Sequence, residues 1–224
     1  MPLENARVKL VSVFTQRCVY LFFALLLLLV MAPFLEDTPR GRIVLNVINI
    51  VTLFTAAVAV SRSRVCFGFA IALGVANIGF QTAANLTGSL PFLMVSRGIG
   101  AAFYFLTVSY LLTYVLRREV LTLDKLYGAA AAFLMVGVLW GYFYIIVLHY
   151  HPGALAAGGQ PVSDPAVSEI IYFSFTALTS TGFGDIVPVH PAARMLCVLE
   201  QVLGVLFIAI LIARLAGTYP PPKD

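Results

Sequence analysis

Six long segments of almost uninterrupted apolar residues dominate this chain. They cover residues 18–34, 43–60, 65–83, 92–116, 126–149 and 192–216. Each is close to the roughly 20 residues that an α-helix needs to cross the hydrocarbon core of a bilayer. Only 11% of the 224 residues are charged, whereas a soluble domain has about a quarter. The sequence therefore predicts an all-α membrane protein with six transmembrane helices.

The positions of Lys and Arg predict how these helices are oriented, because positive residues are retained on the cytoplasmic side of a membrane. With both termini cytoplasmic, ten of the 14 basic residues fall on the inner side: Arg7, Lys9, Arg17, Arg62, Arg64, Arg117, Arg118, Lys125, Arg214 and Lys223. Four fall on the outer side: Arg40, Arg42, Arg97 and Arg194. We interpret the charges as topology signals of a plasma- or inner-membrane protein and expect no binding of nucleic acid.

Little of the chain remains outside the spans. Residues 1–17 place a few apolar side chains among charged ones, which is compatible with a helix that lies along the membrane surface. Residues 218–224 are proline-rich and are expected to form a short cytoplasmic tail. No polar stretch is long enough for a separate ligand-binding domain. The three cysteines adjoin apolar segments, where buried free thiols are expected: Cys18, Cys66 and Cys197.

A shorter apolar segment, residues 165–178, lies between the last two spans. Ser163, Asp164 and Pro165 precede it in the manner of a helix start, and it is too short to cross a bilayer. On the predicted topology it is a re-entrant helix that enters from the outer side. Two glycines follow it, Gly182 and Gly184, and glycine readily adopts the positive φ that lets successive carbonyls face one way. Rings of such carbonyls replace the water shell of a cation in selective channels.

The residues after this helix carry a resemblance to a known family. The segment Ser180-Thr181-Gly182-Phe183-Gly184-Asp185 resembles the filter of the potassium channel superfamily, in which threonine, an aliphatic residue, glycine, an aromatic residue and glycine precede aspartate. The resemblance covers about residues 126–217 and is greatest to small bacterial ion channels with six spans. It implies a homotetramer in which residues 18–118 form a peripheral four-helix domain and residues 119–217 form the pore.

The same resemblance assigns roles to individual residues. It implies K⁺ sites at the carbonyls of four residues, with Gly184 completing the filter: Ser180, Thr181, Gly182 and Phe183. It also implies that four residues support the filter: Thr179, Asp185, Tyr172 and Glu200. In the last helix it implies a hinge and three residues facing a cavity or gate: Gly204, Val205, Ile208 and Ile212. The regular spacing of these three is equally typical of simple packing.

The filter segment also departs from the family pattern. Serine stands in place of threonine at position 180, threonine in place of an aliphatic residue at 181, and Phe183 lacks a tyrosine hydroxyl. Tyr172 and Phe173 occupy positions where many pore helices carry tryptophan. A sodium-conducting or nonselective channel of the same architecture therefore remains an alternative to a potassium channel.

Other classes of protein are less compatible with the sequence. A potassium uptake transporter normally carries four filter repeats in one chain, and this chain has one. A membrane enzyme or a scaffold would need a catalytic cluster or an interaction domain, and we find no nucleotide motif or metal-ligand spacing. We expect no enzyme activity and no cofactor, with K⁺ as the permeant ion and membrane lipids as surroundings.

Several polar residues within or near the spans have two interpretations each. Voltage-sensing helices carry several regularly spaced basic residues, but the fourth segment has only Arg97, so we predict little voltage sensing. Arg97 either snorkels or binds a partner or lipid phosphate. Glu200 is either a hydrogen-bonded or protonated strut behind the short helix, or a residue that modulates ion occupancy. Three histidines map to the outer side, where they are solvated or sense pH: His149, His151 and His190.

Overall fold

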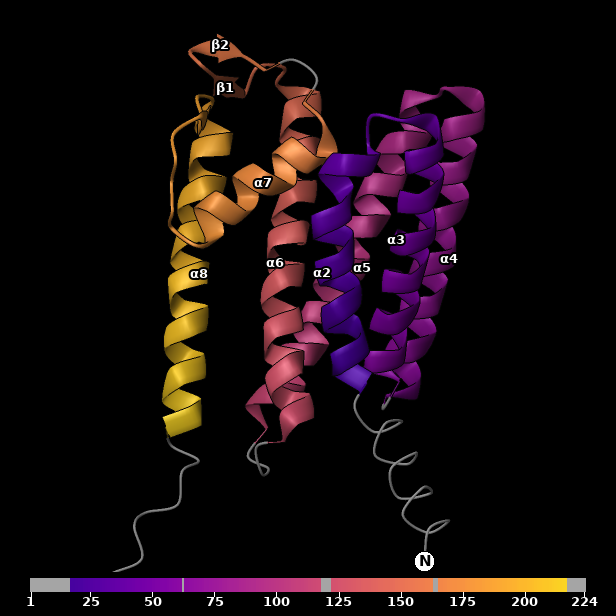
Figure 1. The fold of residues 1–224 in the computed structure, drawn as a ribbon, viewed down its shortest axis with the longest axis vertical. Coiled ribbons are helices and arrows are strands. Elements are labelled where there is room, and N and C mark those ends of the chain that lie inside the picture. Colours follow the sequence, from indigo (N-terminus) through magenta and orange to yellow (C-terminus); the bar gives the residue numbers. More distant parts are fainter. Residues whose placement is uncertain (1–16, 62, 118–121, 163–164, 217–224) are drawn as a thin grey trace, which may run out of the picture.

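The computed structural model describes residues 17–61, 63–117, 122–162 and 165–216. Six of its helices are long and apolar enough to cross a membrane, and they run side by side (Figure 1). They are α2 (Arg17–Leu35), α3 (Pro39–Val60), α4 (Arg64–Thr87), α5 (Leu90–Leu116), α6 (Leu123–Tyr150) and α8 (Pro191–Ala216). The prediction of six spans is confirmed. The predicted surface helix and the tail lie outside the described residues, except for Arg17.

Local sequence explains where several helices begin and end. Ser63 caps α4 by accepting the N–H of Cys66 at 3.3 Å, and Thr122 caps α6 by accepting the N–H of Lys125 at 3.3 Å. Such side chains satisfy amides that have no partner within the helix. Gly88 ends α4 with φ of 63°, a left-handed conformation that glycine adopts without a Cβ clash.

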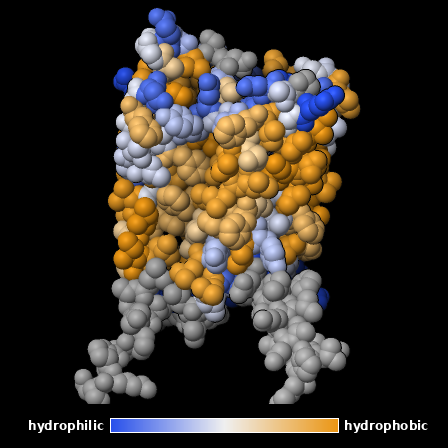
Figure 2. All heavy atoms as spheres, in the orientation of Figure 1, coloured by the Kyte–Doolittle hydropathy of each residue, from blue (hydrophilic) through white to orange (hydrophobic). Residues whose placement is uncertain are grey.

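Helices α2, α3, α4 and α5 pack together beside α6, and α8 stands on the other side of α6 (Figure 1). A core of buried apolar residues fills the space among α2, α3, α5 and α6. By contrast, α8 packs against α6 and the short helix α7 (Val167–Leu178), and much of its remaining apolar surface is exposed. Hydrophobic residues cover the middle of the face shown in Figure 2, and hydrophilic residues gather above them.

A buried carboxylate joins three helices at the end of the bundle opposite α7. Asp124, in the first turn of α6, is 7% exposed. Its Oδ1 accepts the backbone N–H of Cys18 at 2.9 Å, and its Oδ2 accepts the hydroxyl of Tyr114 at 2.9 Å. Lys125 is also buried here, with Nζ 5.8 Å from the centre of the Tyr114 ring. Lys125, which directly precedes the fifth predicted span, thus belongs to the packed start of α6.

The all-α prediction is wrong in one detail, because three short strands form a sheet beside α7. Strands β1 (Leu155–Ala157), β2 (Gln160–Pro161) and β3 (Ile186–Pro188) pair antiparallel in the order β2-β1-β3. Gly158 and Gly159 connect β1 to β2 with φ of 56° and 80°. Two successive positive φ values suit a tight hairpin turn, and Gly-Gly is a sequence signal for one.

Candidate functional site

The short helix α7 lies between α6 and α8 near the end of the bundle that carries the sheet (Figure 1). Close packing holds it there. A Cβ at Gly137 of α6 would lie 2.7 Å from the Phe175 ring, and a Cβ at Gly204 of α8 would lie 1.9 Å from the Leu178 carbonyl oxygen. Only glycine fits at such separations. Gly204 is therefore required for close approach of α8 to the end of α7, and its role as a hinge stays a prediction.

The start of α7 is held by two glutamates. Glu36, which follows α2, accepts the backbone N–H of Val167 at 2.9 Å and that of Ser168 at 3.0 Å through its two carboxylate oxygens. Glu169 accepts the N–H of Ala166 at 3.2 Å. Negative charge at a helix N-terminus is favourable because the first amides have no helical partner. The helix begins two residues after Pro165, and Ser163 and Asp164 lie outside the described residues.

The backbone φ angles alternate in sign along the loop after α7. Ser180, Gly182 and Gly184 have φ of 55°, 55° and 79°, and the intervening Thr181 and Phe183 do not have positive φ. When successive residues alternate between right-handed and left-handed conformations, their N–H groups turn to one side of the chain. The carbonyls then turn to the other side. The positive φ at the two glycines agrees with the sequence analysis, whereas the positive φ at Ser180 was not predicted.

Hydrogen bonds show which side the N–H groups face. The amides of Thr181 and Gly182 both donate to the carbonyl of Thr176 in α7, at 2.9 and 3.2 Å. The described peptide bonds include no cis form, and in a trans peptide the C=O points opposite to the N–H. The carbonyls of Ser180 and Thr181 therefore point away from α7. Within the described residues, no protein group donates a hydrogen bond to them.

Two hydroxyl groups brace the start of this loop. The Thr179 hydroxyl donates to the Phe175 carbonyl at 2.7 Å and lies 2.7 Å from the Thr181 hydroxyl. Because Thr179 has only one hydroxyl proton, Thr181 is the donor in the second contact. The threonine at position 181 thus links the loop to the end of α7, which an aliphatic residue could not do.

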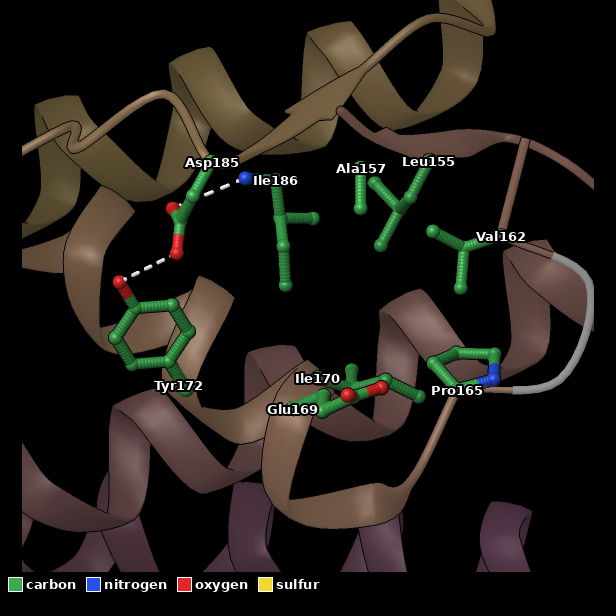
Figure 3. Close-up of a pocket in the computed structure, with 9 residues that line it drawn as sticks. All are labelled: Leu155, Ala157, Val162, Pro165, Glu169, Ile170, Tyr172, Asp185 and Ile186. Carbon is green, nitrogen blue, oxygen red and sulfur yellow. Dashed lines mark hydrogen bonds between the residues drawn. The ribbon is translucent and has the colours of Figure 1, made fainter. Parts of the chain in front are cut away.

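A tyrosine and an aspartate brace the other end of the loop (Figure 3). The Tyr172 hydroxyl donates to Asp185 Oδ2 at 2.8 Å, and Oδ1 accepts the N–H of Ile186 at 3.0 Å. The hydrogen bond from Tyr172 holds the pKa of the Asp185 carboxyl below its ordinary value, and the same bond raises the pKa of Tyr172. The Tyr172 ring also stacks on the Phe183 ring, with centroids 6.3 Å apart.

A cavity of about 270 Å³ opens beside this brace, between α7 and the small sheet (Figure 3). Its walls are mainly apolar, and the polar side chains of Glu169, Tyr172 and Asp185 also line it. Both carboxylates hold backbone amides through one oxygen. Within the described part of the chain, no cluster of three or more His, Cys, Asp or Glu residues could hold a metal ion.

Glu200 of α8 lies behind α7 and is completely buried. Its Oε1 is 2.5 Å from the Ser174 hydroxyl, and its Oε2 accepts the hydroxyl of Tyr144 from α6 at 2.7 Å. The Ser174 hydroxyl also donates to the carbonyl of Gly137 at 2.7 Å. This network joins α6, α7 and α8. Of the two interpretations of Glu200, its geometry favours the strut behind the short helix.

The other residues singled out from the sequence lie apart from the loop. Val205, Ile208 and Ile212 have exposed side chains on α8, and their role in a gate stays a prediction. Arg97 is half-buried, with its guanidinium carbon 5.9 Å from the centre of the Tyr142 ring of α6. The rings of His151 and His190 stack with centroids 4.0 Å apart, and His149 contacts Tyr150.

Sequence reasoning missed Glu36 and Asp124. Both are acidic residues at the edge of an apolar segment, where an unneutralised charge is costly. That position could have indicated a specific partner. The identity of the partners depends on how the helices pack, and a single sequence does not give this.

Residues 130–219 match the model of a protein family described as ion channel. The match extends over most of α6, all of α7, the loop that follows it and α8. No curated protein and no solved structure matches the chain. Residues 130–219 are therefore similar to an ion channel domain, and six helices in the described part of the chain are long and apolar enough to span a membrane. The predicted resemblance to ion channels is confirmed for these residues, without regard to the ion conducted.

Proposed function

We propose that the chain is one subunit of a homotetrameric, potassium-selective channel that conducts K⁺ passively. The ion sites are the backbone carbonyls of four residues in the loop after α7: Ser180, Thr181, Gly182 and Phe183. Gly184 completes the filter, and Thr179, Tyr172 and Asp185 support it. Ions move between adjacent carbonyl sites by mutual repulsion, and the protein supplies no covalent chemistry.

The observation that carries this proposal is the direction of the loop carbonyls. The amides of Thr181 and Gly182 are engaged by Thr176, so the carbonyls of residues 180 and 181 point away from α7 with no protein donor among the described residues. Carbonyls without a donor can coordinate a dehydrated cation. The end of α7, which carries the partial negative charge of a helix C-terminus, adjoins the start of the loop and favours a cation beyond it.

The features that one subunit leaves incomplete support assembly into a tetramer. A single loop provides one wall of a carbonyl-lined path, and irregular backbone at membrane depth persists only where protein or water surrounds it. The filter residues and the α8 residues Val205, Ile208 and Ile212 are exposed in the single chain. Four copies with α8 inside would enclose both, whereas the peripheral helices α2 to α5 would contact lipid.

The proposed orientation places α7 and the filter on the outer side and both termini in the cytoplasm. It agrees with the excess of Lys and Arg on the inner side. The start of α2 and the end of α8 also lie at the same end of the bundle, opposite the sheet (Figure 1). Arg97 is the only basic residue of α5 before its C-terminal end, which supports a channel with little voltage sensing.

A channel that conducts Na⁺ as well as K⁺ is the alternative within the same architecture. The positive φ of Ser180, a non-glycine residue, favours it, because such a conformation is strained in residues with a Cβ. If the strained backbone at Ser180 relaxed, the distance between the carbonyls of the innermost ion site would change. The two possibilities differ only in ion preference.

Ion flux from proteoliposomes tests the proposal. Purified protein is reconstituted in vesicles loaded with K⁺ and, separately, with Na⁺, and Gly182→Asp serves as the nonconducting control. Fast K⁺ flux, slow Na⁺ flux and no flux in the control would support a selective filter. Equal fluxes of both ions would favour the alternative. A mass of one or two subunits in the conducting preparation would contradict the tetramer.

A further inference from the structure

Three hydrogen-bond contacts connect the buried side chain of Glu200 with its neighbours. The hydroxyl groups of Ser174 and Tyr144 have only two protons between them. The contacts are Ser174 Oγ to the Gly137 carbonyl, Ser174 Oγ to Glu200 Oε1 and Tyr144 OH to Glu200 Oε2, at 2.7, 2.5 and 2.7 Å. The two distances of 2.7 Å are those of ordinary O–H···O hydrogen bonds, and the distance of 2.5 Å is at the short limit for such a bond. Three hydrogen bonds need three protons.

Ser174 has one hydroxyl proton and Tyr144 has one. The Gly137 carbonyl has none, so Ser174 must donate to it. Tyr144 donates to Oε2 of Glu200. The remaining contact, between Oε1 and the Ser174 oxygen, then has no proton unless Glu200 carries it. An ionised Glu200 would bring two oxygen acceptors together at 2.5 Å with no hydrogen between them.

Burial points to the same protonation state. Glu200 is 0% exposed and lies in a helix long and apolar enough to span the membrane. No basic side chain forms an ion pair or hydrogen bond with it in the described part of the chain; its partners are Ser174 and Tyr144. A carboxylate buried without a counter-charge is strongly disfavoured, and it takes up a proton instead.

We infer that Glu200 is a neutral carboxylic acid whose Oε1–H donates to Ser174. This hydrogen bond holds α7 in position and, through α7, the filter. The inference rests on the proposed function for the identity of the filter. Oε1 is the hydroxyl oxygen of the acid, and Oε2 is its carbonyl oxygen, hydrogen-bonded by Tyr144. Glu200 is a positioning residue, since it acts on the filter through α7 and touches no filter residue itself.

The path from Glu200 to the loop is short. Ser174 lies two residues before Thr176, whose carbonyl receives the amides of Thr181 and Gly182. Leu178, one turn after Ser174, is the residue against which Gly204 of α8 packs. The Glu200 proton thus fixes α7 to α8 in the turn that anchors the filter backbone.

Substitution by glutamine provides the sharpest test. In Glu200→Gln the amide N–H₂ replaces the acid O–H as donor to Ser174, and the amide oxygen still accepts from Tyr144. We expect this variant to keep the wild-type ratio of K⁺ to Na⁺ flux. Glu200→Leu, which fills the same space without a donor, should lose that ratio. If the leucine variant also keeps the wild-type ratio, the positioning role is overturned.

Infrared spectroscopy tests the protonation state without reference to ion flux. The difference spectrum of wild type against Glu200→Gln should contain the carbonyl stretch of a protonated carboxylic acid. Tyr144→Phe should shift that band to higher frequency, because the acid carbonyl loses its hydrogen-bond donor. Glu169→Gln, at an exposed glutamate, is the matched control and should leave the band in place.

The two kinds of failure are distinguishable. A difference spectrum with no acid band would overturn the neutral Glu200, whatever ions the protein conducts. Equal fluxes of K⁺ and Na⁺ in the wild type would instead contradict the proposed selectivity, and the band would still report the proton on Glu200.

Discussion

The carboxylate of Glu36 accepts the backbone N–H of Val167 at 2.9 Å, although 131 residues separate them in the sequence. Glu36 follows α2, and Val167 is the first residue of α7. At the opposite end of the bundle, Asp124 of α6 accepts the backbone N–H of Cys18 at the start of α2. Helix α2 is therefore hydrogen-bonded at one end to α7 and at the other end to α6, each time through one carboxylate.

Removal of the Glu36 carboxylate is expected to weaken the start of α7. Loss of a capping side chain costs about 0.5–2 kcal/mol, and Glu36→Ala removes the acceptor of two amides at once. We predict a lower thermal midpoint for the detergent-solubilised protein and reduced ion flux. Asp37→Ala is the matched control, since this neighbouring acid is exposed. Equal effects of the two substitutions would contradict a specific role for Glu36.

The buried pair of Asp124 and Tyr114 is expected to be energetically coupled. Asp124→Asn keeps an oxygen for the Cys18 amide, but its amide nitrogen cannot accept from the Tyr114 hydroxyl. A buried group left without a partner costs about 1–3 kcal/mol. Tyr114→Phe alone should therefore destabilise the protein, and it should cost less when Asn is already present. Additive losses of stability in the double variant would show that the two side chains are independent.

A methyl group at position 204 is expected to disturb the filter. The Cβ of Gly204→Ala would meet the Leu178 carbonyl oxygen at 1.9 Å, so α7 and α8 must separate. Overpacking of this kind costs about 1–3 kcal/mol. We predict that the variant loses ion flux or selectivity. Gly79→Ala, at a glycine of α4 with open space around it, should conduct as the wild type does.

The hydrogen bond between Tyr172 and Asp185 is expected to protect the filter against acid. It lowers the pKa of Asp185, so the stabilisation that the charged carboxylate provides is present above its ordinary pKa and is lost as pH falls through the lowered value. In Tyr172→Phe the pKa rises, and acid should reduce K⁺ flux at a higher outer pH than in the wild type. Recordings in planar bilayers at stepped outer pH measure this. Identical acid profiles would exclude the effect.

The elements of the fold that depend on local composition could be predicted from the sequence. Long apolar segments gave the spans to within a few residues, because backbone groups in lipid must pair within a helix. The short helix was predictable from its apolar residues and its length, but it begins at Val167, two residues after the predicted start at Pro165. Gly158 and Gly159 carried a local signal for the hairpin as well. The contacts of Glu36, Asp124 and Glu200 were not predictable in this way, because each joins segments far apart in sequence.

In the candidate site, too, residue type predicts some features and the packing of distant segments determines the others. The positive φ of Gly182 and Gly184 could be inferred from residue type, whereas that of Ser180 could not, since serine rarely adopts it. The distance between Gly204 and Leu178 arises from the crossing of α8 over α7. The sequence marks position 204 as a glycine, but only the packing of the two helices explains why a larger residue does not fit.

Strand β3 begins one residue after Asp185 and pairs with β1, while the amides of Thr181 and Gly182 are fixed to α7. The segment between these two anchors is a closed loop of a few residues. A short closed loop has far fewer conformations available than a free chain end. The backbone of residues 182–185 thus gains little entropy by leaving its native shape, and the pairing of β3 with β1 stabilises that shape from its C-terminal end.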